Sequence, residues 1–475
     1  MYSSIKITTV VVCFLFSNIA FLAAQQRGDR IVVMADVDAK IASKVVDKAY
    51  GGHIDTITEI NGKWCSLTRI KGWVPNQHVM NLDMAEDSYT NRIKKNESDF
   101  DALATRGMIH FERDDFNLAL KDLNESIRLQ PRIPVTFNNR AVVLKAMGRY
   151  PEALLNLDQS IKLRPDYADA YENRGLVLVS MGQYEPAIEN FDKAISMRKD
   201  NPWSYINRGT ARSNAGDYKG AKHDFLEALK KNRNISDAYI GLSIVYLAEQ
   251  DLDKALKFAN QAVKKNPKNG LAYNQRGWTL YKTDKLDEAI YDFDKAIRFA
   301  PNLSIVFNNR GVCYHDQGEY KSALKDLNRA VALNSGSAVA YTNRGTTQMA
   351  LKNYKKAKYD LSKAVKLAPK LADASNALGW FLATCPDQQF RDGKAAVTHA
   401  MKACENSQWK DWSYIDTLAA ANAESGNFDK AIEMANKAIE IAPKEEVDDC
   451  KDRLAMFEAK KAYRSDFGKS AVKRG

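Results

Sequence analysis

The sequence predicts a mainly α protein, in which an α-solenoid of helix–turn–helix repeats follows a small all-β barrel. The first observation behind this prediction is a 34-residue period that runs through most of the chain. The second is a set of small residues at fixed distances from the anchor residue of each period. The third is an N-terminal segment whose apolar runs and Asn-Gly turn are typical of strands.

The composition is that of a folded protein. The chain has 475 residues, a formal net charge of +11 and 45% hydrophobic residues, which excludes collagen-like and low-complexity disordered classes. The positive charge is spread along the chain, apart from a basic end between Lys460 and Arg474, so we expect no nucleic-acid site. Beyond the leader, cysteines are few, scattered and odd in number, which predicts neither a disulfide framework nor a CxxC metal pair.

Residues 1–24 predict a secretory signal peptide. An apolar run from Ile7 ends in Ala23-Ala24 and is followed by polar residues, so cleavage would yield a secreted or periplasmic protein. An uncleaved membrane anchor is the alternative, because the run is barely long enough to span a bilayer. No other stretch is apolar enough, so we expect no membrane span after cleavage of the signal.

Residues 30–83 are expected to be β-structured, with Asn61-Gly62 as a hairpin turn. The predicted strands are Ile31–Met34, Ile54–Ile60 and Trp64–Ile70. The spacing of Gly62-Lys63-Trp64 and Gly72-Trp73-Val74-Pro75 resembles bacterial Src-homology-3-like domains. This resemblance implies a small barrel that either contacts peptidoglycan or peptides, or serves as a cap or spacer. Residues 84–99 follow as a linking or capping helix.

A column of arginine marks the repeat when the chain is written in rows of 34. The column contains Arg106, Arg140, Arg174, Arg208, Leu242, Arg276, Arg310, Arg344 and Leu378, and a tenth row is displaced to Leu418 by an insertion at 386–393. Thirteen residues after each of the first eight anchors stands Ala, which lets two helices approach closely. Glycine marks the turn between the helices in five rows, and proline closes several second helices.

This pattern resembles the tetratricopeptide repeat. The resemblance implies ten helix pairs over residues 100–445 that stack into a right-handed superhelix. Residues 446–475 would form a capping helix and a basic tail, because Val447, Cys450, Leu454 and Phe457 follow helical spacing. We expect the insertion at 386–393 to be an ordered loop, and loops on rigid scaffolds often carry function.

The arginine column is predicted to be structural rather than an anion site. Sixteen residues after the arginines stand Asp122, Asn156, Asn190, Asp224, Asp292, Asp326 and Asp360. Where the anchor becomes Leu242, its partner becomes Phe258, and where it becomes Leu418 the partner becomes Met434. This exchange indicates an ion pair between the two helices, since an unpaired charge there would be costly.

The candidate peptide-binding residues are the amides that precede the anchor. They are Asn139, Asn173, Asn207, Gln275, Asn309 and Asn343. The resemblance implies that they project from the first helix into a concave groove, where an amide can pair with the peptide groups of an extended chain. The alternative is that each amide bonds the backbone of the adjacent repeat. Trp278 and Tyr281 are further candidates on the same face, either exposed in the groove or packed on neighbours.

No motif for catalysis or for a cofactor is present. HExxH, GxSxG and GxGxxG do not occur, and the six histidines lie in different rows. The sequence therefore predicts a non-enzymatic scaffold that needs no cofactor or metal and binds an extended peptide or disordered protein segment. The alternatives are a cell-wall module that contacts peptidoglycan through residues 30–83, and an accessory subunit of a separately encoded enzyme.

Overall fold

The computed structural model describes seven strands between Arg30 and Asn81 and the continuous chain over residues 79–468, with side chains from residue 80 onward. The predicted signal peptide and the last residues of the basic tail lie outside the described residues.

The N-terminal strands are short. They are β1 (Arg30–Val33), β2 (Val37–Ile41), β3 (Lys44–Ala49), β4 (Ile54–Asn61), β5 (Trp64–Leu67), β6 (Trp73–Pro75) and β7 (Val79–Asn81). They pair antiparallel in the order β3-β2-β6-β5-β4-β1-β7. Asn61 lies opposite Trp64 across β4 and β5, at the place where the sequence predicts a hairpin turn. The barrel and its Src-homology-3-like nature remain predictions.

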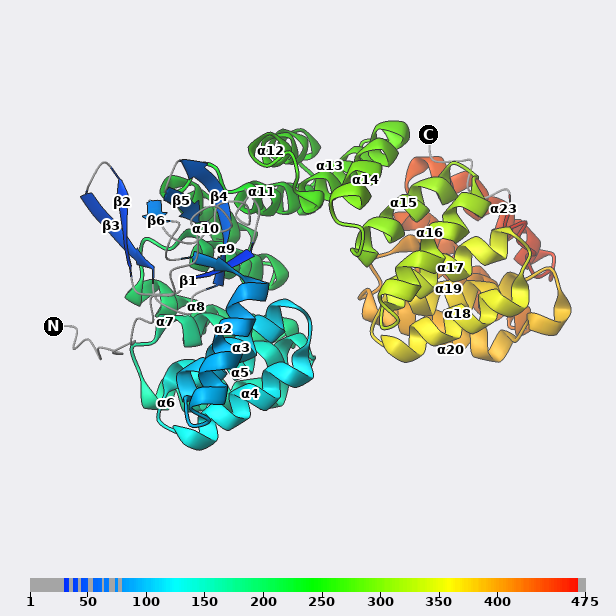
Figure 1. Cartoon of the computed structure of the whole chain (residues 1–475). Coiled ribbons are helices and arrows are strands. Elements are labelled where there is room, and N and C mark those ends of the chain that lie inside the picture. The colour runs from blue at the N-terminus through cyan, green and yellow to red at the C-terminus, as the bar shows by residue number, and fades with distance from the viewer. Residues whose placement is uncertain are drawn as a thin grey trace. The chain divides into compact units, whose positions relative to one another are not determined.

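Ten consecutive helix pairs follow in the described part of the chain (Figure 1), as the 34-residue period predicts. The first five pairs are α3 (Phe100–Glu112) with α4 (Phe116–Leu129), α5 (Pro134–Ala146) with α6 (Tyr150–Leu163), α7 (Ala168–Ser180) with α8 (Tyr184–Met197), α9 (Pro202–Asn214) with α10 (Tyr218–Lys231), and α11 (Ser236–Ala248) with α12 (Leu252–Lys265). The next five are α13 (Gly270–Lys282) with α14 (Leu286–Phe299), α15 (Ser304–Asp316) with α16 (Tyr320–Leu333), α17 (Ala338–Ala350) with α18 (Tyr354–Leu367), α19 (Ala372–Thr384) with α20 (Gly393–Asn406), and α21 (Trp412–Glu424) with α22 (Phe428–Ile441).

Small residues allow the two helices of each pair to approach closely. The alanines that stand thirteen residues after the first eight anchors all have no exposed surface. On the first helix, a Cβ added to Gly175 would stand 2.6 Å from the ring of Phe191 on the second helix. At Gly277 the corresponding distance, to the ring of Phe293, is 2.9 Å. Glycine is therefore required there by the aromatic side chain that it faces.

The turn within nine of the ten described pairs uses a left-handed residue, and the insertion joins α19 to α20 instead. Glycine occupies this place in five rows, with φ between 74° at Gly148 and 86° at Gly216. Other rows reach the same region without glycine, as at Gln250 with φ 62° and Lys352 with φ 60°. A non-glycine residue in this conformation costs about 1 kcal/mol or more. The packing of the helix pair, and not glycine alone, therefore sets the turn.

The described helices belong to two compact units, residues 1–227 and residues 228–475. Within each unit the first helices of neighbouring repeats contact one another, as α5 does α7 in one unit and α13 does α15 in the other. Within a unit, second helices also contact the first helix of the next repeat, as α14 does α15. The first helices therefore form one layer of each unit, and the exposed side of that layer is called the first-helix face below.

Additional helices cover the ends of the repeats. At the N-terminal end, α2 (Leu82–Lys95) buries Ala85 and Tyr89 against α3. At the other end, α23 (Val447–Glu458) follows the short 3-10 helix η3 (Lys444–Glu446) and buries Cys450 and Phe457. The insertion is ordered and contains the 3-10 helix η2 (Gln388–Phe390). None of the helices that the structure describes is long and apolar enough to cross a bilayer.

Candidate binding face on the first helices

The six candidate peptide-binding amides are called the ladder amides below. Five of them donate a hydrogen bond to a neighbouring repeat. Asn173 Nδ2 donates to Asn138 Oδ1 at 2.8 Å, and Asn207 Nδ2 donates to Glu172 Oε1 at 2.9 Å. Each acceptor lies 35 residues earlier, on the preceding first helix. Asn139 is also on a first helix, α5, and is half-buried.

In the second unit the same contacts form a connected network. Asn309 Nδ2 donates to Asn274 Oδ1 at 3.1 Å, and Asn343 Nδ2 donates to Asn308 Oδ1 at 2.9 Å. Asn308 Nδ2 also donates to Asn309 Oδ1 at 3.3 Å, so four amides cross-link α13, α15 and α17. Gln275 donates to Ser243 Oγ at 3.1 Å. The amides thus join adjacent repeats, as one alternative predicts, but through side chains rather than the backbone.

Burial divides the ladder amides into two groups. Gln275 and Asn309 are each 6% exposed, whereas Asn173, Asn207 and Asn343 keep more of their surface accessible. A side-chain amide has two N–H groups and a carbonyl oxygen, so one bond to a neighbouring repeat leaves further hydrogen-bonding capacity. The half-buried amides are therefore better placed to meet a peptide than Gln275 and Asn309.

Trp278 and Tyr281 form an aromatic pair on α13. Their ring centroids are 4.9 Å apart with an interplanar angle of 22°, and both rings pack against the core of that repeat. The Lys282 ammonium lies 5.0 Å from the Trp278 ring and 5.5 Å from the Tyr281 ring. The Tyr281 hydroxyl donates to Asp316 Oδ2 at 2.6 Å, in the next repeat. Both predicted roles, groove contact and packing on neighbours, are therefore compatible with this half-buried pair.

A row of exposed apolar residues lies beside the ladder. Its members share the second position of a first helix and are Val135, Trp203, Leu271, Ile305 and Val339. Each has between 42% and 48% of its surface exposed. The sequence analysis did not predict this row as a binding surface. The signal was present as one apolar residue four places before five of the six ladder amides, since Asp169 stands before Asn173.

The arginine column pairs as predicted. The ion pairs join Arg106 to Asp122, Arg208 to Asp224, Arg276 to Asp292, Arg310 to Asp326 and Arg344 to Asp360, with shortest N···O distances of 2.6–2.7 Å. Where the anchor is Leu242, it is fully buried and Phe258 stacks on Tyr246 at 5.3 Å instead. Arg174 is an exception, because its contact is with Asp158 at 3.2 Å, and the amide of Asn190 donates to Pro186.

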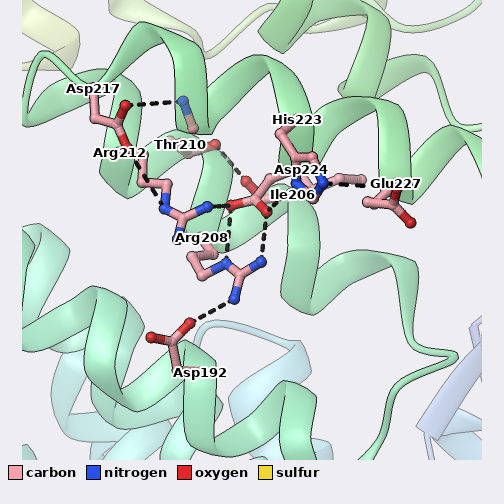
Figure 2. A network of polar contacts seen from close by, with 10 residues as sticks. Asp192, Ile206, Arg208, Thr210, Arg212, Asp217, His223, Asp224 and Glu227 are labelled. Atoms are coloured by element: carbon pink, nitrogen blue, oxygen red, sulfur yellow. Dashed lines mark hydrogen bonds and ion pairs between the residues drawn. The ribbon is translucent and has the colours of Figure 1, made fainter.

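Each arginine also reaches back to the preceding repeat, which the sequence analysis missed. Figure 2 shows Arg208 between Asp224 of its own pair and Asp192 of α8, sixteen residues before it. Asp224 has no exposed surface and accepts from Arg208 Nη2 at 2.6 Å and from Arg212 Nη1 at 2.9 Å. The guanidinium donors are consumed within the protein, which favours a structural role over an anion site.

The pKa shifts of the anchor arginines depend on whether the partner on the second helix is charged. The hydrogen bond to Asp292 raises the pKa of Arg276, although burial opposes it. In the Arg140 row the partner is the neutral Asn156 amide, at 2.6 Å, and burial lowers the pKa of Arg140. The carboxylates therefore stabilise the buried guanidinium charge.

A metal site and a reactive thiol each place requirements on the described side chains. Among residues 80–468, no group of His, Cys, Asp and Glu could hold a metal ion. The cysteines Cys313, Cys385, Cys404 and Cys450 are buried free thiols, and burial raises the pKa of each. Buried thiols of this kind behave as small apolar residues.

Family models match much of the repeat region. Residues 143–182 and 175–216 match a model described as TPR repeat, and residues 206–270, 270–303, 304–337, 338–371 and 416–445 match models described as Tetratricopeptide repeat. A search of curated proteins found no match.

Several solved structures are similar to this chain. The APC/C hetero-tetramer Cut9-Hcn1 is 13% identical over 75% of this chain and 76% of that chain, with a TM-score of 0.53. A tetratricopeptide repeat protein from Parabacteroides merdae is 18% identical over 53% of this chain and all of its own, with a TM-score of 0.46. The human IFIT1 dimer with PPP-AAAA is 18% identical over 76% of this chain and 95% of its own, with a TM-score of 0.48. Because the matched repeats together cover more than half of its residues, the chain belongs to the tetratricopeptide repeat family.

Proposed function

We propose that the chain is a non-enzymatic protein-interaction scaffold, whose first-helix face binds an extended peptide or disordered segment of a partner protein. The observation that carries this proposal is the exposed apolar row of the second unit, Leu271, Ile305 and Val339. Val135 and Trp203 stand at the same helix position in the first unit. Exposed apolar residues are ordinary when they are single, but Leu271, Ile305 and Val339 occupy one fixed place of three successive repeats and so form a surface.

The row and the ladder complement each other chemically. Each apolar residue precedes its ladder amide by four positions, so the two lie on the same face of the helix, one turn apart. The apolar side chains would cover the side chains of the guest, and the half-buried amides would pair with its peptide groups. Such a wall recognises an extended chain with little dependence on its sequence.

The predicted signal peptide supports a secreted or periplasmic location for this scaffold. In that setting, the β-structured region of residues 30–83 is a second point of contact, for which peptidoglycan is the candidate ligand.

A charge placed in the apolar row should weaken peptide binding. Peptides selected from a random extended-peptide library on the purified chain should lose about tenfold to a hundredfold in affinity when Ile305 is replaced by Asp. The reason is that burial of an isoleucine side chain contributes about 1.5–3 kcal/mol, and the buried carboxylate adds a desolvation cost. Fluorescence anisotropy with a labelled selected peptide measures the change.

The matched control is Tyr291→Asp. Tyr291 is 57% exposed on α14, the second helix of its repeat, and so lies outside the first-helix face. This variant should bind as the parent chain does. An equal loss of peptide affinity in both variants would contradict binding on the first-helix face. So would an affinity that Ile305→Asp leaves unchanged.

A further inference from the structure

Residues 461–468 pack against the second unit. After α23, residues 461–466 form no helix or strand, and a turn follows at Phe467 and Gly468. Ser465 and Phe467 are only 4% and 6% exposed, although Asp466 between them is exposed. Alternating burial of this kind is typical of an extended peptide bound to a surface.

The docked segment crosses several repeats of the second unit. Arg464 Nη1 lies 2.7 Å from Glu424 Oε2 at the end of α21, and the Ser465 N–H donates to the carbonyl oxygen of Thr384 at 3.0 Å. The Tyr320 hydroxyl, at the start of α16, donates to the carbonyl oxygen of Gly468 at 3.1 Å. The segment therefore runs from the end of the solenoid back towards earlier repeats.

Phe467 enters a cluster of aromatic rings. Its ring centroid lies 6.1 Å from that of Tyr354 in an edge-on arrangement, and 6.4 Å from that of Phe381 in a stacked one. Phe390, from the insertion, closes against Tyr354 at 6.0 Å and Phe381 at 6.1 Å. We call Tyr354, Phe381 and Phe390, together with Glu424 and the Thr384 carbonyl, the tail pocket.

The other members of the pocket are held without the tail. Arg391 Nε also donates to Glu424, at 2.9 Å, and Arg391 Nη1 donates to the Cys385 carbonyl oxygen at 2.9 Å. Glu424 is therefore fixed and charge-paired even when Arg464 leaves. The three rings contact one another independently of Phe467, so the site is preorganised for an aromatic side chain.

We propose that the tail pocket is a binding site for an extended segment of another protein, in which arginine is followed three residues later by phenylalanine. The chain's own tail occupies this site in the absence of the partner. The proposal rests on the docked tail and not on the exposed apolar row, so its test is independent of the test of the proposed function.

The tail is a displaceable ligand because of how it is attached. Its contacts include the side chains of Arg464 and Phe467 and the backbone groups of Ser465 and Gly468, all of which a separate peptide with the same side chains can offer. A short tether gives an effective concentration on the order of mM, so the tail suppresses weak ligands and yields to a partner that binds more tightly.

A labelled synthetic peptide with the sequence of residues 459–468 tests this site in the full chain. Fluorescence anisotropy should show that Phe467→Ala, which vacates the aromatic pocket, binds the peptide at least tenfold more tightly than the parent chain. Ser465→Pro, which removes the N–H donor to Thr384, should act in the same direction without changing either ring or charge.

Peptide controls separate this site from nonspecific attachment. In the Phe467→Ala chain, a peptide with alanine at the position of Phe467 should bind at least tenfold more weakly, and Glu424→Gln should weaken binding of the unmodified peptide. Circular dichroism verifies that each variant is folded. Equal affinity of the parent and both tail variants, or indifference to the peptide's phenylalanine, would overturn the proposal.

Discussion

Replacing Asp292 with alanine is expected to lower the free energy of unfolding by about 3 kcal/mol. Asp292 is 1% exposed and accepts from Arg276 Nε at 2.6 Å and from Arg276 Nη2 at 2.7 Å. The substitution leaves a half-buried guanidinium between helices without a carboxylate, and the loss of both bonds adds to the desolvation cost. Urea unfolding followed by circular dichroism measures the change.

The chain supplies the control for this experiment. Leu242 and Phe258 stand at the same two places of another repeat and pack without any charge. The double variant Arg276→Leu with Asp292→Phe should therefore recover most of the stability lost in Asp292→Ala. A double variant that is no more stable than Asp292→Ala would show that the pair does not act as an interchangeable unit.

Replacing Gly175 with alanine is expected to lower the free energy of unfolding by up to about 2 kcal/mol, because overpacking costs about 1–3 kcal/mol and the helix propensity of alanine offsets about 1 kcal/mol. The new methyl group would stand 2.6 Å from the Phe191 ring, which lies in the core with no exposed surface. This overpacking outweighs the gain of about 1 kcal/mol that alanine has over glycine inside a helix. Thermal unfolding of the two chains measures the difference.

A second substitution should relieve this clash. In the neighbouring repeat the same two places hold Ala141 and Leu157, so Phe191→Leu should restore stability in the Gly175→Ala background. Additive destabilisation by the two changes would contradict direct contact between them.

The helix pairs and the arginine pairs could be predicted because they are periodic. Leu242 and Phe258 replace both members of the ion pair in one repeat, and this joint replacement indicates the pair from a single sequence. The contacts of the arginines with the preceding repeat also leave a pattern in the sequence. Asn or Asp stands sixteen residues before each anchor from Arg140 to Arg344, except in the Leu242 row.

Features outside the period could not be predicted. The contact between Tyr320 and Gly468 joins residues 148 positions apart, and nothing in the spacing of the tail points to it. The ladder amides could be located but not their partners, because a 35-residue offset joins two different columns of the repeat. The apolar row was visible in the sequence, but only the structure shows that its members are exposed rather than packed in the core.

Hydroxyl-radical footprinting of the chain with and without a selected peptide tests the binding face most directly. Bound peptide should lower the oxidation of Leu271, Ile305 and Val339, and leave Tyr291 and Tyr359, which are exposed on second helices, unchanged. Protection of Tyr291 and Tyr359 with no change at the three first-helix residues would contradict binding on the first-helix face.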